Sequence, residues 1–136
     1  RLCPVDYHRF HFPDDGSFCE DYHILGEYHS VNPLALKFKP DIFIKNERHV
    51  SILQTQNFGK IAYIEVGATM VGKIIQTYRG RNFSRGDEKG YFLFGGSTVI
   101  ILGELGRWIP DDDILNCTQN RTEVLIKLGQ SIGHKI

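Results

Sequence analysis

A glycine pair followed by two hydroxyl side chains, Gly95-Gly96-Ser97-Thr98, lies within an otherwise apolar stretch. A hydroxyl placed directly after a glycine can reach the carbonyl carbon of its own preceding peptide bond, here Gly96. If a base removes the Ser97 proton, the oxygen can attack that carbon and convert the amide into an ester. Elimination of the ester would cut the chain and leave dehydroalanine, and loss of ammonia would leave a pyruvoyl ketone. The same four residues also fit an inert strand–bulge–strand, so other features must decide between these alternatives.

Two histidines three residues apart, His8 and His11, lie in an aromatic-rich segment near Arg1. Imidazoles this close together indicate proton transfer or a metal site, and the structural alternative is a hydrogen-bonded pair in an aromatic cluster. The histidines further along the chain do not complete a recognised ligand spacing, so a metal site is the weakest of the three hypotheses.

The composition of the chain excludes some classes of function. The 136 residues include 16 basic and 16 acidic side chains, which argues against a nucleic-acid binder because such proteins usually carry a basic excess. No apolar run approaches the roughly 18 residues of a membrane span. Cys3, Cys19 and Cys117 fit neither a disulfide framework nor a zinc pattern. The chain begins at Arg1 within an apolar-polar pattern, which we interpret as a piece whose upstream region is missing.

The elements that would position these groups are mainly strands. Apolar, β-branched runs flank the glycine pair, and Gly59–Tyr78 predicts two strands with glycine bends. We expect Glu123–Gly129 to form a further strand and Asp111–Asp113 to cap a single helical turn. Ser30–Leu34 predicts a turn that leads into an extended piece. Asn46-Glu47-Arg48 is either a solvated turn or holds a buried Glu–Arg pair.

Several motifs occur together in one order along the chain. They are Asp6–His11 with Pro13, Val31–Leu34, Asn46–Arg48, Val66–Gly72 and Phe94–Thr98. In this combination the chain resembles the C-terminal catalytic part of phosphatidylserine decarboxylase. Gly86–Phe92 and Asp113–Asn116 resemble most the branch of that family called type II.

The resemblance implies a division of the chain at the Gly96–Ser97 bond. Residues 1–96 would be the β-chain part and residues 97–136 the α-chain part of a single catalytic domain. Ser97 would become the pyruvoyl group, which captures the substrate's amine as a Schiff base. His11 would be the base of the self-processing triad, and His8 would handle the substrate and its proton. The triad aspartate would lie upstream of this chain, because Asp6 does not match it.

The implied activity is that of a lyase, which converts phosphatidylserine to phosphatidylethanolamine and CO2 in phospholipid biosynthesis. The implied prosthetic group is the pyruvoyl group derived from Ser97, with no metal and no pyridoxal phosphate. The implied partners are phosphatidylserine, the membrane surface and the α and β chains of one precursor, with a homodimer left open and no nucleic acid. The implied location is peripheral, on a bacterial cell membrane or a eukaryotic endomembrane. The implied fold is a mainly β, compact barrel-sandwich hybrid of short, mostly antiparallel strands with little helix.

Other hypotheses remain open on the sequence alone. A related enzyme on the same scaffold would decarboxylate a free amino acid such as tryptophan, because the catalytic motif does not distinguish head groups. An inactive fragment would act only as a β-rich binding module, although Lys73 lacks the flanking residues of a lipoyl or biotinyl carrier. The hypothesis of a metal hydrolase is supported only by the number of histidines.

Overall fold

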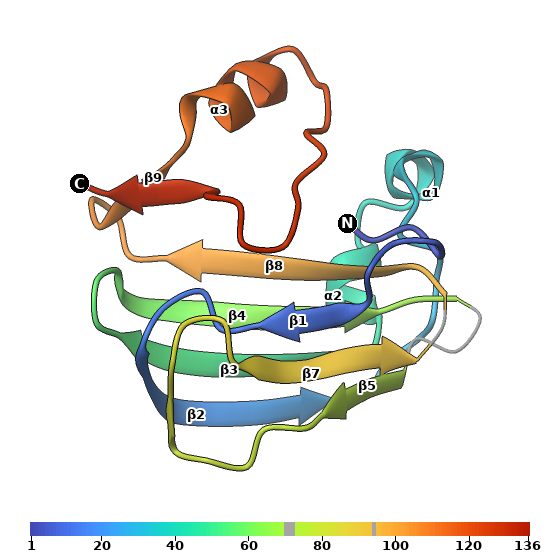
Figure 1. Ribbon diagram of the computed structural model, residues 1–136. Helices are drawn as coiled ribbons and strands as arrows, with labels where there is room; N and C mark the ends of the chain where they lie inside the picture. Colours follow the sequence, from blue (N-terminus) through green and yellow to red (C-terminus); the bar gives the residue numbers. More distant parts are fainter. Residues whose placement is uncertain (70–72, 94) are drawn as a thin grey trace.

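The computed structural model describes residues 1–69, 73–93 and 95–136 (Figure 1). The end of the predicted Val66–Gly72 motif and the first residue of Phe94–Thr98 therefore lie outside the described residues. The described chain is mainly β, with short and almost entirely antiparallel strands and little helix, which confirms the predicted fold class. Within the described residues no sheet closes into a barrel.

The larger sheet has five antiparallel strands in the order β6-β2-β3-β4-β8. Their bounds are β2 Gly16–Ile24, β3 Arg48–Thr55, β4 Gly59–Gly67, β6 Asn82–Phe83 and β8 Ser97–Gly103. The two strands predicted in Gly59–Tyr78 are confirmed as β4 and β5, Lys73–Gln76. Strands also flank the glycine pair, as expected, because β7 ends at Leu93 and β8 begins at Ser97.

A three-stranded sheet, β1-β7-β5, lies over the larger one in Figure 1. Its bounds are β1 Arg9–His11, β5 Lys73–Gln76 and β7 Glu88–Leu93. Phe10 and Phe92 from this sheet pack with Leu53, Ile61 and Tyr63 of the larger sheet, and all five side chains are buried. This apolar layer fixes the two sheets against each other, and therefore fixes the histidine segment relative to β8.

The remaining elements are short. They are α1 Pro33–Phe38, α2 Ile42–Lys45, α3 Asp112–Gln119, and a two-stranded sheet of β9 Trp108–Pro110 and β10 Gly133–Lys135. Among the described residues, the helices are all too short or too polar to cross a bilayer.

Three local predictions were wrong. Glu123–Gly129 forms no strand. The helix after Asp111 runs from Asp112 to Gln119, which is longer than a single turn. Residues 33–38 are helical rather than extended, because Pro33 occupies the first helical turn and the Asn32 side chain accepts a hydrogen bond from Ala35 N at 2.7 Å.

The Glu–Arg hypothesis for residues 46–48 was also wrong. Buried Glu47 pairs with His23, with Nε2 and Oε1 2.9 Å apart, and accepts a hydrogen bond from Tyr28. The Arg48 guanidinium instead donates to the Asn46 carbonyl at 3.1 Å. Successive side chains along an extended segment point to opposite faces, so Glu47, which precedes β3, and Arg48, its first residue, are directed apart.

Candidate active site

Ser97 is held between two backbone neighbours at the start of β8. It pairs with Gly67, the last residue of β4, and forms an isolated bridge with Leu2 on its other side. Leu2 N donates to Ser97 O at 2.8 Å, and Ser97 N donates to Leu2 O at 3.2 Å. These contacts bury Ser97 completely, with 0% of its surface exposed.

The Ser97 hydroxyl has no hydrogen-bond partner within the described residues, although it is fully buried. Most buried polar side-chain atoms in native proteins are hydrogen-bonded, and leaving one unpaired costs about 1–3 kcal/mol. A buried hydroxyl that no structural contact uses is free to act as a nucleophile on an adjacent group. The nearest carbonyl carbon along the chain is that of Gly96, which precedes it.

The two glycines before Ser97 serve different purposes. Gly95 has a φ of 94°, in the left-handed region that favours glycine. Gly96 does not have a positive φ, and a Cβ built on it would lie 3.7 Å from Val31 Cγ2 and 3.9 Å from Leu2 O. Gly95 is therefore required for the backbone turn, whereas the space beside Gly96 is open enough for ordinary contacts.

His8 contacts this turn directly. Its Nε2 lies 2.6 Å from the carbonyl oxygen of Gly95, and its Nδ1 lies 2.7 Å from the carbonyl oxygen of Asp6. Carbonyl oxygens only accept hydrogen bonds, so both contacts are satisfied together when each ring nitrogen carries a proton. His8 is thus placed as a proton donor next to the glycine pair.

His11 has a different hydrogen-bond pattern. Its Nδ1 lies 2.9 Å from the Gly86 carbonyl oxygen, which fixes Nδ1 as the protonated nitrogen. Its Nε2 lies 2.8 Å from the Tyr7 hydroxyl, which is able to donate to it. With the hydroxyl as donor, Nε2 accepts through its lone pair, the arrangement that a general base requires. The structure brings His8, and not His11, into hydrogen-bond contact with the Gly95–Ser97 turn.

Asp6 does not orient either histidine through its carboxylate. Its Oδ2 accepts a hydrogen bond from the Cys3 backbone at 2.7 Å, and only its main-chain carbonyl contacts His8. Among the described residues, no group of three or more histidine, cysteine or acidic side chains is placed to hold a metal ion.

Sequence reasoning missed a buried ion pair next to the histidine strand. Lys89 Nζ lies 2.7 Å from Glu65 Oε1, and both side chains are almost fully buried. The Lys89 ammonium also donates to Gln76 at 2.8 Å. It lies 5.7 Å from the ring centre of Phe10, which stands between His8 and His11 in the sequence. The inward alternation of Ile61, Tyr63 and Glu65 along β4 was the available signal.

Burial raises the pKa of Glu65 to about 7, and the neighbouring Lys89 ammonium opposes this shift without cancelling it. The pair connects β4, whose last residue Gly67 pairs with Ser97, to β7, which ends at Leu93. It therefore links the two sheets on either side of the core.

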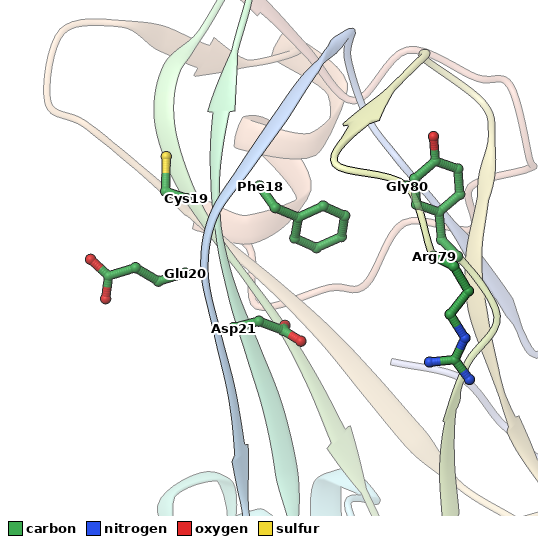
Figure 2. A pocket seen from close by; sticks show the side chains of 7 residues that line it. Phe18, Cys19, Glu20, Asp21, Arg79 and Gly80 are labelled. Carbon is green, nitrogen blue, oxygen red and sulfur yellow. The ribbon is translucent and has the colours of Figure 1, made fainter.

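The surface also carries an open hollow of about 320 Å³ between β2 and residues 78–80. Figure 2 shows Asp21 on one side of it and Arg79 on the other. Its lining does not include either site histidine or Ser97, so it is separate from the candidate active site.

Comparison with known proteins shows the family of this chain. A sequence model of the phosphatidylserine decarboxylase family matches residues 1–134. The chain belongs to the phosphatidylserine decarboxylase family. It is 50% identical to a phosphatidylserine decarboxylase proenzyme of Clostridium botulinum strain Eklund 17B, over 100% of this chain and 46% of that protein. It is 51% identical to the proenzyme of Ruminiclostridium cellulolyticum, over 100% and 46% of the two chains.

The proenzyme of Clostridium tetani is 52% identical, over 99% of this chain and 46% of that protein. The chain thus spans about half the length of the phosphatidylserine decarboxylase proenzymes that it matches. The resemblance seen in the sequence motifs is confirmed at the level of the family.

Proposed function

We propose that this chain is the catalytic part of a phosphatidylserine decarboxylase that matures by cutting itself at Gly96–Ser97. The observation that carries the proposal is the buried Ser97 hydroxyl, which has no hydrogen-bond partner among the described residues and directly follows the glycine turn. Maturation would divide the sequence into residues 1–96 and 97–136. Both pieces would stay together, because β8 remains paired with β4 across the cut.

The cut would follow the chemistry of an activated nucleophile. His11 Nε2 exchanges its Tyr7 partner for the Ser97 hydroxyl and takes its proton, while its Nδ1 stays on the Gly86 carbonyl. Ser97 Oγ then bonds to the Gly96 carbonyl carbon as the C–N bond breaks, which gives an ester. Loss of the Ser97 Cα proton and cleavage of its Cβ–Oγ bond release the Gly96 carboxylate and leave dehydroalanine. Water then replaces the nitrogen, which leaves as ammonia.

The residues around Ser97 fit the resulting prosthetic group. Once formed, the pyruvoyl group supplies a carbonyl that binds an amine and withdraws electrons from its α-carbon, with no need for a metal or pyridoxal phosphate. His8 is the proton donor closest to that position, through its contact with Gly95. We assign it the return of a proton to the α-carbon after CO2 leaves, a transfer that typically contributes about 10²–10⁴-fold in rate.

The proposed substrate is phosphatidylserine in a bilayer, and the proposed location is the membrane surface, as a peripheral protein. The test compares CO2 release by the complete gene product from phosphatidylserine vesicles and from free amino acids, including tryptophan. Release from the lipid alone, abolished by Ser97→Ala in a folded protein, is the expected result. Release from a free amino acid but not from the lipid would overturn the substrate assignment, and equal release by Ser97→Ala would overturn the mechanism.

A further inference from the structure

Two short helices lie directly beside the Ser97 turn. Val31, which is the nearest side chain to the open side of Gly96, packs in a buried cluster with Ile42 of α2 and Ala68. Ala68 follows Gly67, the β4 partner of Ser97. Figure 1 shows α1 and α2 at the end of the large sheet where β4 ends and β8 begins. The inner sides of these helices therefore form part of the wall of the active site.

The same helices also carry exposed apolar side chains. Leu34 and Phe38 are separated by four residues and so share one face of α1, where they are 65% and 77% exposed. Ile44 of α2 is 71% exposed. Leu25 is also exposed, and its neighbour Gly26 lies so close to the Lys45 carbonyl that no Cβ would fit between them. The segments that carry these four side chains contact one another, because Glu27 N donates to the Lys45 carbonyl at 2.9 Å and Ile42 N to the Lys39 carbonyl at 3.4 Å. Single exposed apolar residues are ordinary, but several on adjoining segments favour an interaction surface.

The charge of these helices is positive, although the whole chain is neutral. Residues 33–45 carry three lysines, Lys37, Lys39 and Lys45, and one acidic residue, Asp41. Lys45 pairs with Asp41 at 2.7 Å, and Lys39 lies 3.4 Å from Glu27. Lys37 forms no ion pair within the described part of the chain, and it projects from the helix that carries Leu34 and Phe38. Apolar anchors interspersed with lysines are typical of surfaces that bind anionic lipid headgroups.

We propose that the exposed side chains of Leu25, Leu34, Phe38 and Ile44, with Lys37, form a docking surface for an anionic lipid bilayer. The surface inserts its apolar side chains at the level of the headgroups and places the Gly95–Ser97 turn beside them. That a lipid headgroup reaches the Ser97 turn from this surface rests on the proposed function. Binding of the surface to the bilayer does not. A second copy of the chain or a soluble partner protein on this surface would be a contrary outcome of the tests below.

The first test locates the contact directly. An environment-sensitive nitrobenzoxadiazole label is attached at Phe38→Cys in the complete gene product, in a background with every native cysteine replaced by serine. The matched control carries the label at Leu105→Cys, an apolar residue that is more exposed than Phe38 and lies in the turn between β8 and β9. Vesicles containing phosphatidylglycerol should shift and enhance the emission at position 38 and leave position 105 unchanged. Unchanged emission at position 38 in vesicle-bound protein would overturn the proposal, as would a shift that depends on protein concentration without vesicles.

The second test separates docking from chemistry. Phe38→Asp with Ile44→Asp should weaken activity on vesicle phosphatidylserine by about tenfold or more, because burial of each large apolar side chain contributes on this scale. Activity on a short-chain, monomeric phosphatidylserine should be retained, and Leu105→Asp should leave both activities unchanged. Equal loss on both substrates would contradict a docking role. Failure of the wild-type protein on both substrates would instead contradict the proposed function, so the two failures are distinguishable.

Discussion

His8 Nε2 lies 2.6 Å from the carbonyl oxygen of Gly95, two positions before the buried hydroxyl of Ser97. Its other ring nitrogen faces a second carbonyl, so the ring is held as a donor on both sides. His11 faces a carbonyl and a hydroxyl, so only one of its nitrogens must donate. The two imidazoles therefore differ in their hydrogen-bond partners, in the way that the two tasks we propose for them require.

His8→Ala should leave the chain cut but should lower the rate of decarboxylation by about 10²–10⁴-fold, because the proton donor to the substrate is lost. His134→Ala is the matched control, since His134 is an exposed histidine that pairs with Asp111 far from the turn. Gel analysis of the cut and CO2 release measure the two effects separately. Full decarboxylation activity in His8→Ala would refute this role.

His11→Ala should prevent the cut, because the proposed mechanism uses Nε2 of His11 as the base, while its Nδ1 faces the Gly86 carbonyl. Tyr7→Phe removes only the hydroxyl that occupies His11 Nε2, so cutting should continue at the wild-type rate or faster. The rate is followed by gel electrophoresis after synthesis of the precursor. Normal cutting by His11→Ala would show that the base lies elsewhere, and a block in Tyr7→Phe would show that the Tyr7 hydroxyl does more than occupy His11 Nε2.

Gly95→Ala and Gly96→Ala should differ in stability. Alanine at position 95 must adopt a φ near 94°, which costs about 1–3 kcal/mol in the free energy of unfolding. Alanine at position 96 meets only ordinary contacts and should change stability by about 0.5 kcal/mol or less. Urea denaturation of the uncut Ser97→Ala protein measures both without interference from cleavage. Equal costs at the two positions would contradict the observed turn.

Glu65 should lower the free energy of unfolding as the pH rises. An ordinary ion-paired carboxylate has the opposite effect. Its folded pKa of about 7 exceeds its ordinary value of 4.5, mainly because it is buried. Between these values the folded state holds a proton that the unfolded state releases. The contribution of Glu65 is therefore fully present below about pH 4.5 and is lost as the pH rises through about 7.

Glu65→Gln removes this titration while keeping the size of the side chain. The free energy of unfolding of the wild-type protein, relative to Glu65→Gln, should fall by up to about 3 kcal/mol between pH 4.5 and pH 8. Both proteins contain the same exposed carboxylates, such as Glu27, whose lowered pKa makes stability rise with pH. Their contribution therefore cancels when the two proteins are compared. A difference that stays constant with pH, or that rises, would contradict the burial of an ionisable Glu65.

The strands and the candidate nucleophile followed from local patterns. Alternation along residues 60–66, interrupted by Gly67, located β4, and the apolar run after the glycine pair located β8. These patterns are readable because a strand with one buried face must alternate, and a glycine marks the residue where alternation stops.

Other features depended on contacts that sequence alone does not contain. Residues 123–129 have the apolar content of a strand, but Leu125 and Leu128 are exposed and find no neighbouring strand in the described chain. The Glu65–Lys89 pair joins residues on different sheets, and the tautomers of His8 and His11 depend on the carbonyls of Gly95 and Gly86. Such pairings arise only when distant segments pack together.

The most direct test of the proposed maturation is the intact mass of the active, complete gene product. It should consist of two pieces, one ending at Gly96 and one beginning at position 97, and the second should be lighter by one ammonia than a chain with an N-terminal serine. Active protein that consists of a single chain with an unmodified Ser97 would contradict the account.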